Sequence, residues 1–191
     1  MGQRIEYAPV WLLVRLLGAL PRPLARGLGI AFAHLMSWLY PRLRRVGLRN
    51  LEIAFPEKPA AERRRILRRM FTNLGRQLAD FTHLPRFTRS TISKLAIYDG
   101  FEHFDAANRR GKGVFFLTAH LGGWEVASFT HSLHGYPLRI VIRPLDNPYL
   151  DRFVDRIRTQ HGNTTIGKDE FARGLLAAMR EAATVGILMD T

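Results

Sequence analysis

The stretch that decides the fold is GVFFLTAHLGGWE, residues 113–125. An apolar run rich in Val and Phe stops at Thr118, and the chain then presents His120, passes two glycines and resumes at Trp124. This pattern predicts a buried strand, a tight turn and the start of a helix. Because ligands of open α/β sheets bind at the carboxyl ends of the strands, His120 is placed for chemistry.

A carboxylate follows this histidine at a useful distance. Glu125 lies five residues after His120, in the first turn of the predicted helix, where the glycine turn can fold it back towards the imidazole. A carboxylate there can accept one ring N–H, fix the tautomer and leave the other nitrogen as a base. The alternative is a satisfied structural pair, because an isolated His-x4-Glu spacing arises by chance in many chains.

Short apolar runs alternate with helical patterns over the second half of the chain. The predicted strands are residues 95–98, 114–117, 138–142, 164–166 and 185–189, and the predicted helices are 101–110, 124–133, 148–161 and 171–182. This alternation predicts an α/β fold with a mainly parallel sheet, in which 114–117 is the central strand and helices cover both faces. Right-handed crossovers would place His120, Arg143 and Asp190 along one edge of the sheet.

Arg143 follows the predicted strand 138–142 and precedes Pro144. At the sheet edge, its guanidinium can bind a phosphate through paired hydrogen bonds. The alternative is a strand-end arginine that pairs with Asp146. His131 and His134 have a spacing that can bind metal, but no third ligand is evident, so no metal site is expected.

The positive charge of the chain is confined to its first part. The net charge is +13, and residues 1–113 hold 21 Lys and Arg against 8 Asp and Glu, whereas residues 114–191 hold 8 against 8. Nucleic acid, an anionic membrane or an anionic substrate would each suit such a field. Nucleic acid is the least favoured, because long apolar segments interrupt the arginines and no recognised module is present. The absence of cysteine excludes disulfides and thiolate chemistry.

Residues 8–40 are strongly apolar, but arginines interrupt them and Pro21 and Pro23 break any single helix. A membrane-spanning helix needs about 20 predominantly apolar residues. Two helical pieces in a membrane interface are therefore expected, and a pair of ordinary core helices is the alternative. We accordingly expect a membrane-associated segment over residues 1–45 and an α/β domain over 46–191.

A long amphipathic helix is predicted from residue 59 to about 83, with a strongly basic start, ERRRILRR, at residues 62–69. The dipole of a helix disfavours cations at its N-terminus, so an external anion would relieve the repulsion. The alternative is a solvated charged face.

The string TAHLGGWE resembles the HX4(D/E) acyltransferase motif in the form typical of the lipid A biosynthesis acyltransferases, the lauroyl and myristoyl transferases of Gram-negative envelopes. The resemblance extends to the N-terminal apolar segment, to NLEIAFP at residues 50–56, and to residues 141–190. It implies a glycerolipid-acyltransferase-like fold. It also implies transfer of a fatty acyl group from a thioester, on acyl carrier protein or coenzyme A, to a hydroxyl of a phosphorylated lipid A precursor. No cofactor is expected, and the site would lie on the cytoplasmic face of the inner membrane.

The resemblance also suggests roles for the candidate site residues. His120 would be the general base and Glu125 its orienting group, and the backbone N–H groups of Gly122 and Gly123 are available for an oxyanion. Arg143 lies in the family's R-P-L segment. Asp190 matches the Asp-Gln that ends the family's strand, whereas Thr191 departs from it. The family continues beyond this point, so a C-terminally truncated chain is expected. The alternatives are an inactive family member and a basic protein that binds a membrane surface.

Overall fold

The computed structural model describes residues 2–189, and their contacts separate into two units. One unit is Leu12–His83, and the other joins residues 2–11 to residues 84–189. Helix α1, Gly2–Ala19, contributes its first turns to the larger unit and the rest to the smaller one. Hydropathy along the sequence predicts a domain boundary after residue 45, whereas these two units are defined by contacts. The boundary after residue 45 therefore remains a prediction about membrane association.

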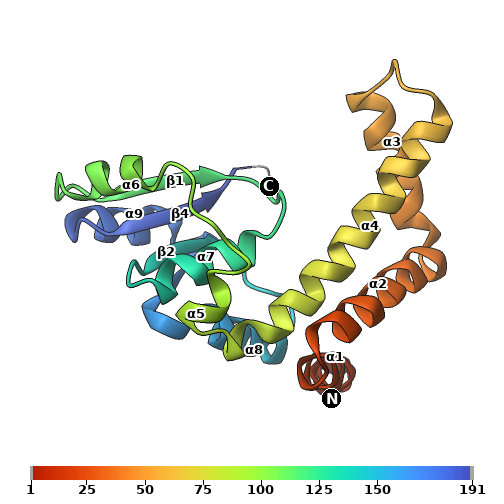
Figure 1. The fold of residues 1–191 in the computed structure, drawn as a ribbon, viewed down its shortest axis with the longest axis horizontal. Coiled ribbons are helices and arrows are strands. Elements are labelled where there is room, and N and C mark those ends of the chain that lie inside the picture. Colours follow the sequence, from red (N-terminus) through yellow and green to blue (C-terminus); the bar gives the residue numbers. More distant parts are fainter. Residues whose placement is uncertain (1, 190–191) are drawn as a thin grey trace. The chain divides into compact units, whose positions relative to one another are not determined.

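Within the described residues, the larger unit is built on a four-stranded parallel sheet (Figure 1). Its strands are β1, Val114–Thr118; β2, Leu138–Ile142; β3, Thr164–Gly167; and β4, Thr184–Leu188. The spatial order is β1-β4-β2-β3, and every pairing is parallel. All four carboxyl ends therefore lie along the same edge, and the predicted α/β class is confirmed.

Helices follow the strands as the alternating pattern predicts. The helices of this unit after α1 are α5, Arg89–Ile92; α6, Phe101–Asn108; α7, Trp124–Leu133; α8, Pro148–Arg158; and α9, Phe171–Arg180. Helix α8 starts where the Asn147 side chain accepts hydrogen bonds from the N–H groups of Tyr149 and Leu150. It ends at Arg158, before the predicted residue 161, because the chain turns at His161 through a left-handed φ of 62°.

Two details of the predicted sheet are wrong. Residues 95–98 form no strand, and Tyr98 instead packs its ring against Phe101 and His131. Strand β1 lies at one edge of the described sheet and not at its centre, because it pairs with β4 alone among the described strands. Phe116 packs against Phe104, whereas Phe115 and Leu117 on the opposite side are 45% and 65% exposed. A short apolar run does not reveal which strand will pair beside it.

The first turns of α1 belong to the larger unit through polar contacts with the start of α8. The Asn147 side chain donates to the Gln3 carbonyl at 2.7 Å, and Arg4 Nε donates to the Tyr149 hydroxyl at 3.1 Å. Tyr7 packs against the rings of Tyr149 and Phe153. The beginning of the chain is thereby joined to the helix that precedes β3.

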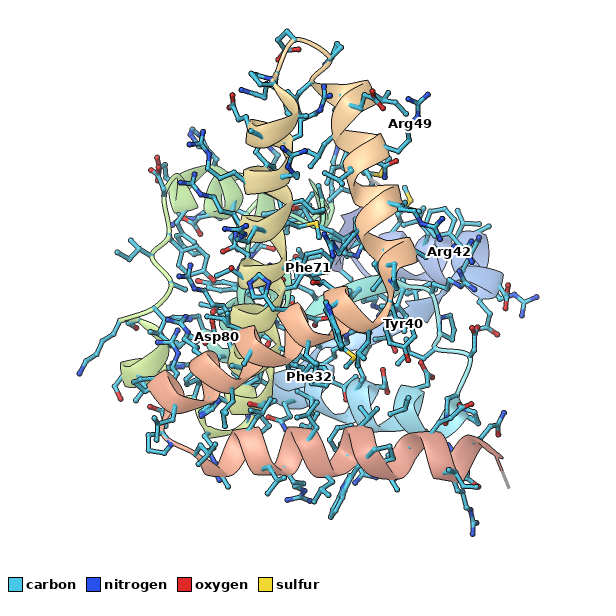
Figure 2. All side chains as sticks on the ribbon, turned by 90° about the vertical axis from the view of Figure 1, so that its right-hand side faces the viewer. Phe32, Tyr40, Arg42, Arg49, Phe71 and Asp80 are labelled. Carbon is cyan, nitrogen blue, oxygen red and sulfur yellow. The ribbon has the colours of Figure 1, made fainter. Side chains whose placement is uncertain are left out.

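The smaller unit consists of the end of α1 and three further helices: α2, Arg22–Leu39; α3, Pro41–Ala54; and α4, Ala60–His83. Figure 2 shows α2 crossing α4, on which Phe71 and Asp80 are labelled. The crossing is close because it is made at Gly29 and Gly75, where a Cβ on either glycine would lie within 2.5 Å of the other helix's backbone. The expected break between two helical pieces falls at Pro21, directly before α2.

A partly buried ion cluster also joins α2 to α4. Asp80 accepts hydrogen bonds from Arg22 at 2.8 Å and from Arg26 at 2.7 Å. Burial pushes the pKa of Asp80 upward, but the hydrogen bonds from Arg26 and Arg22 outweigh it and hold this pKa below its ordinary value. Two of the arginines that interrupt the apolar segment therefore serve the internal packing of this unit.

Within residues 2–189, no helix combines the length and hydropathy that crossing a bilayer would demand. Many large apolar side chains on the first three helices are nevertheless exposed: Trp11, Leu12, Leu16, Leu24, Leu28, Leu35, Trp38, Leu39, Leu43 and Val46.

Candidate active site

The carboxyl ends of the four strands surround one cleft of about 730 Å³. Its lining includes His120 after β1, Arg143 after β2, Lys168 after β3 and Met189 after β4. The fold thus brings His120 and Arg143 to the same cleft, although they lie 23 positions apart in the sequence. Asp190, the third residue predicted at this edge, lies outside the described residues.

The glycine turn presents His120 at the start of α7. Gly122 has a left-handed φ of 62°, a conformation that glycine adopts without steric cost. Gly123 is the N-cap of α7 and provides no side chain to cap the helix, whose first N–H groups have no intrahelical partners. The exposed imidazole of His120 packs edge-on against the Trp124 ring, with 5.0 Å between centroids.

The Glu125 carboxylate is held by Arg158, which sequence reasoning did not single out. Arg158 Nε lies 3.1 Å from each carboxylate oxygen, and Nη2 donates to Oε1 as well. The two side chains are only 19% and 21% exposed, so the pair is shielded from most solvent. A basic residue in the last turn of a helix is ordinarily explained by the helix dipole, so the sequence carried no specific signal for this contact.

A second pocket, of about 240 Å³, adjoins the cleft and is mostly apolar. Five residues line both spaces: Trp124, Ile142, Arg158, Ile187 and Leu188. The rest of the pocket lining includes Phe116, Leu138, Ile140 and Gly186 from three of the strands, together with Glu125 from α7. An apolar chain can therefore enter the protein beside a cleft that carries charged side chains and a histidine.

His131 lies on the wall of this apolar pocket and is only 5% exposed. The Tyr98 hydroxyl lies 2.9 Å from its Nδ1, and its Nε2 has no hydrogen-bond partner among the described residues. Burial, with a smaller effect from His134, lowers the pKa of His131 to about 4. It is therefore neutral near pH 7, and residues 2–189 contain no group of three metal-ligating side chains around it or elsewhere.

Arg143 and Lys168 are the exposed cations of the cleft. Arg143 lies 3.6 Å from Asp146, as the alternative interpretation of this arginine expects. Both side chains are highly exposed, and an ion pair of that kind contributes little. Lys168 has no carboxylate partner among the described residues, and only the parallel pairing of β3 with β2 reveals that it belongs to this edge.

The fold and the cleft together define an α/β protein with a histidine at the edge of a parallel sheet, beside a pocket suited to an apolar chain. The sequence model of the bacterial lipid A biosynthesis acyltransferases matches residues 4–191, and the chain belongs to this family. The resemblance carried by TAHLGGWE is thereby confirmed.

Curated relatives agree with this assignment. The chain is 30% identical over 176 residues to a lipid A biosynthesis acyltransferase of Haemophilus influenzae. This alignment covers 90% of the chain and 54% of the relative. It is 26% identical to the lipid A biosynthesis lauroyltransferase and 24% identical to the palmitoleoyltransferase of Escherichia coli, with 95% of this chain and 57% of each relative covered. The chain thus spans about half the length of the curated relatives it matches.

Proposed function

We propose that this protein transfers a fatty acyl group from an acyl thioester to a hydroxyl group of a lipid A precursor. The observation that carries this proposal is the arrangement of the two spaces, an apolar pocket that shares a wall with the cleft containing His120. The pocket can take the hydrocarbon chain, while the cleft takes the polar groups of donor and acceptor. Relatives that are named as lipid A acyltransferases support the same chemistry.

In the proposed reaction, His120 removes the proton of the acceptor hydroxyl as its oxygen attacks the thioester carbonyl carbon. This attack forms the C–O bond and leaves the negative charge on the former carbonyl oxygen. Collapse of the tetrahedral intermediate then restores the carbonyl and breaks the C–S bond. The proton then passes from His120 to the departing thiolate, so the donor leaves as a thiol. No covalent enzyme intermediate is required, because the thioester is already activated.

Charged and backbone groups around the base would stabilise the developing charges. Glu125, whose carboxylate is held by Arg158, is proposed to orient His120 and to stabilise the imidazolium that forms on it. The N–H groups at the Gly122-Gly123 turn are proposed donors to the oxyanion. Arg143 and Lys168 are proposed to bind a phosphate of the acceptor or of the donor's carrier arm. Asp190 remains a predicted substrate-binding residue.

We propose that the protein works at the cytoplasmic face of the inner membrane. Exposed leucines and tryptophans on the first helices, close in sequence to many arginines, support attachment to an anionic surface. The same features favour the second candidate function, a basic protein that binds membranes without catalysing acyl transfer. Acyl carrier protein and coenzyme A are both candidate donors.

The test is acyl transfer to a lipid A precursor by the wild-type chain and by His120→Ala, with His103→Ala as the control. His103 is an exposed histidine on α6 that lies outside the cleft lining. We expect the control to keep its activity. The rate of His120→Ala should fall by a factor of about 10² to 10⁴, which is the usual contribution of a general base. Activity retained by His120→Ala would refute this base, and an inactive wild-type chain would leave only the membrane-binding function.

A further inference from the structure

Four arginines surround a groove in the smaller unit that the proposed acyl transfer does not use. Arg45 and Arg49 come from α3, and Arg63 and Arg64 come from the beginning of α4. The groove has a volume of about 300 Å³ and is completed by Leu48, Glu52 and Ala60. Figure 2 shows α3 and this part of α4 side by side, with Arg49 labelled on α3.

Close packing of the two helices keeps these arginines near one another. Gly47 of α3 faces Leu67 of α4, and a Cβ on this glycine would lie 2.5 Å from a Leu67 methyl carbon. Arg63 also donates to the carbonyls of Phe55 and Pro56 in the connection between the helices, at 3.4 Å each. The groove is therefore set by packing and by backbone contacts, whereas flexible surface arginines alone would spread apart.

The charges around this groove are not balanced by the protein. Residues 41–69 contain ten Lys and Arg but only three Asp and Glu, a net charge of +7 out of the +13 of the whole chain. Glu52 is the single carboxylate of the lining and is paired with Arg49 at 2.7 Å, and Glu62 is paired with Lys58 at 2.8 Å. Arg45 and Arg64 have no carboxylate partner within the described part of the chain.

The state of Glu52 agrees with this excess of positive charge. Its hydrogen bond from Arg49 lowers the pKa of Glu52 below its ordinary value, and the charge of Arg63 acts in the same direction. Glu52 is thus ionised at neutral pH, and the groove still carries three more positive charges than negative ones. Repulsion among those arginines falls when an anion enters.

Exposed apolar side chains on the helix that carries Arg45 and Arg49 indicate where that anion comes from. No residue of α3 is fully buried, and Leu43, Val46, Ile53 and Phe55 are all exposed on or just after this helix. Exposed apolar side chains beside arginines suit the boundary between lipid headgroups and acyl chains. An acidic soluble protein would account for the arginines but not for the exposed Ile53 and Phe55, which follow the groove residues of α3 along the chain.

We propose that the α3–α4 groove is a discrete binding site for the phosphate of an anionic phospholipid headgroup. The proposal rests on the membrane attachment proposed above and is independent of acyl transfer. It differs from general attraction to an anionic surface because it assigns the binding to the particular arginines of the groove. Occupation of the groove would place the exposed side chains of α3 at the level of the lipid headgroups.

The test compares two double variants that remove the same charge from the full chain. Arg45→Gln/Arg64→Gln removes two arginines of the groove, and Arg42→Gln/Arg69→Gln removes two exposed arginines of the same helices outside its lining. None of the four has a carboxylate partner among the described residues, so neither variant leaves a carboxylate unpaired. Binding is measured by flotation with phosphatidylcholine vesicles that contain or lack phosphatidylglycerol.

We expect the groove variant to lose about thirtyfold in affinity for the phosphatidylglycerol vesicles, since each basic residue contributes about 1 kcal/mol at an anionic surface and 1.4 kcal/mol is tenfold. The control variant should lose less than about threefold, because its arginines lie outside the groove, bind no phosphate directly and contribute only a salt-screened attraction that falls off with distance from the surface. Equal losses would show that only net charge matters, and the discrete site would be refuted. Wild-type binding that is independent of phosphatidylglycerol, or that is found only with an acidic carrier protein, would also refute it.

A second measurement keeps the proposal testable if the groove variant fails to fold. Inorganic phosphate should release the wild-type chain from phosphatidylglycerol vesicles more effectively than chloride at the same ionic strength, because it competes for the guanidinium groups. Equal effects of the two salts would contradict a phosphate site. Neither measurement uses a thioester, so a chain that transfers no acyl group can still pass both.

Discussion

The crossing of α2 over α4 predicts opposite effects for two Gly→Ala substitutions. At Gly75 a new Cβ would lie 2.5 Å from the Gly29 carbonyl oxygen and from Ile30 Cα, and 2.6 Å from the Ile30 nitrogen. Ordinary contacts of a Cβ begin at 3.4 Å, so the two helices must separate by about 1 Å at this point. The obstructing atoms belong to backbone, and no change of rotamer can move them away.

The magnitude follows from two opposing terms. Replacing glycine by alanine inside a helix stabilises it by up to about 1 kcal/mol. Overpacking a well-packed contact typically costs about 1 to 3 kcal/mol, and the upper part of that range applies because backbone must move. Separation of the helices also loosens the buried cluster of Leu17, Ala25 and Ala79 beside the crossing. We therefore expect Gly75→Ala to destabilise the chain by about 2 kcal/mol.

Gly27→Ala is the matched control, because Gly27 lies within α2 and a Cβ there would meet nothing within 4 Å. This substitution should stabilise the chain by about 0.5 to 1 kcal/mol. Both changes in the free energy of unfolding can be measured by urea denaturation, followed by the helical circular dichroism signal at about 222 nm. A Gly75→Ala chain at least as stable as wild type would refute the close crossing, as would equal changes in the two variants.

Three further predictions concern the cleft and its pocket. Arg158→Gln should destabilise the chain by roughly 2 kcal/mol, which is less than the cost of breaking a fully buried ion pair, because both side chains keep some exposure. Adding Glu125→Gln should restore most of this stability, as measured by denaturant unfolding. The pKa of His131, about 4 in the folded chain against about 6.5 unfolded, predicts full stability above pH 6.5 and a loss as the pH falls towards 4. The pKa difference limits this loss of stability to about 3 kcal/mol, and solvent in the pocket should reduce it to roughly 2 kcal/mol. When the free energy of unfolding is measured at several pH values, His131→Phe should depend less on pH than the wild-type chain. Gly186→Val, at a pocket position where a Cβ meets nothing within 4 Å, should shift acyl transfer towards shorter donors, and an unchanged preference across a series of chain lengths would exclude this pocket as the acyl site.

Local patterns predicted the elements of the α/β part well. The helix over residues 124–133 and the strand over 138–142 match α7 and β2 residue for residue. Hydrophobic periodicity, a glycine turn and short apolar runs are properties of neighbouring residues, so they can be recognised without tertiary contacts. The same stretch placed His120 at the end of a strand, which the structure bears out.

Contacts between distant residues could not be predicted in this way. Among the described strands, the expected central strand β1 lies at the edge of the sheet, and β4 lies between it and β2. Arg158 was overlooked because its partner Glu125 lies 33 residues earlier, and nothing near it in sequence distinguishes it from other basic residues of α8.

The sequence by itself therefore determined the parallel α/β class, the histidine at a strand end and the concentration of positive charge before residue 114. Only the tertiary structure decided the order of the strands, the union of His120, Arg143 and Lys168 in one cleft, and the groove between α3 and α4. The physical reason is that a residue's conformation depends mostly on its neighbours in the chain, whereas a binding site depends on which distant segments pack together.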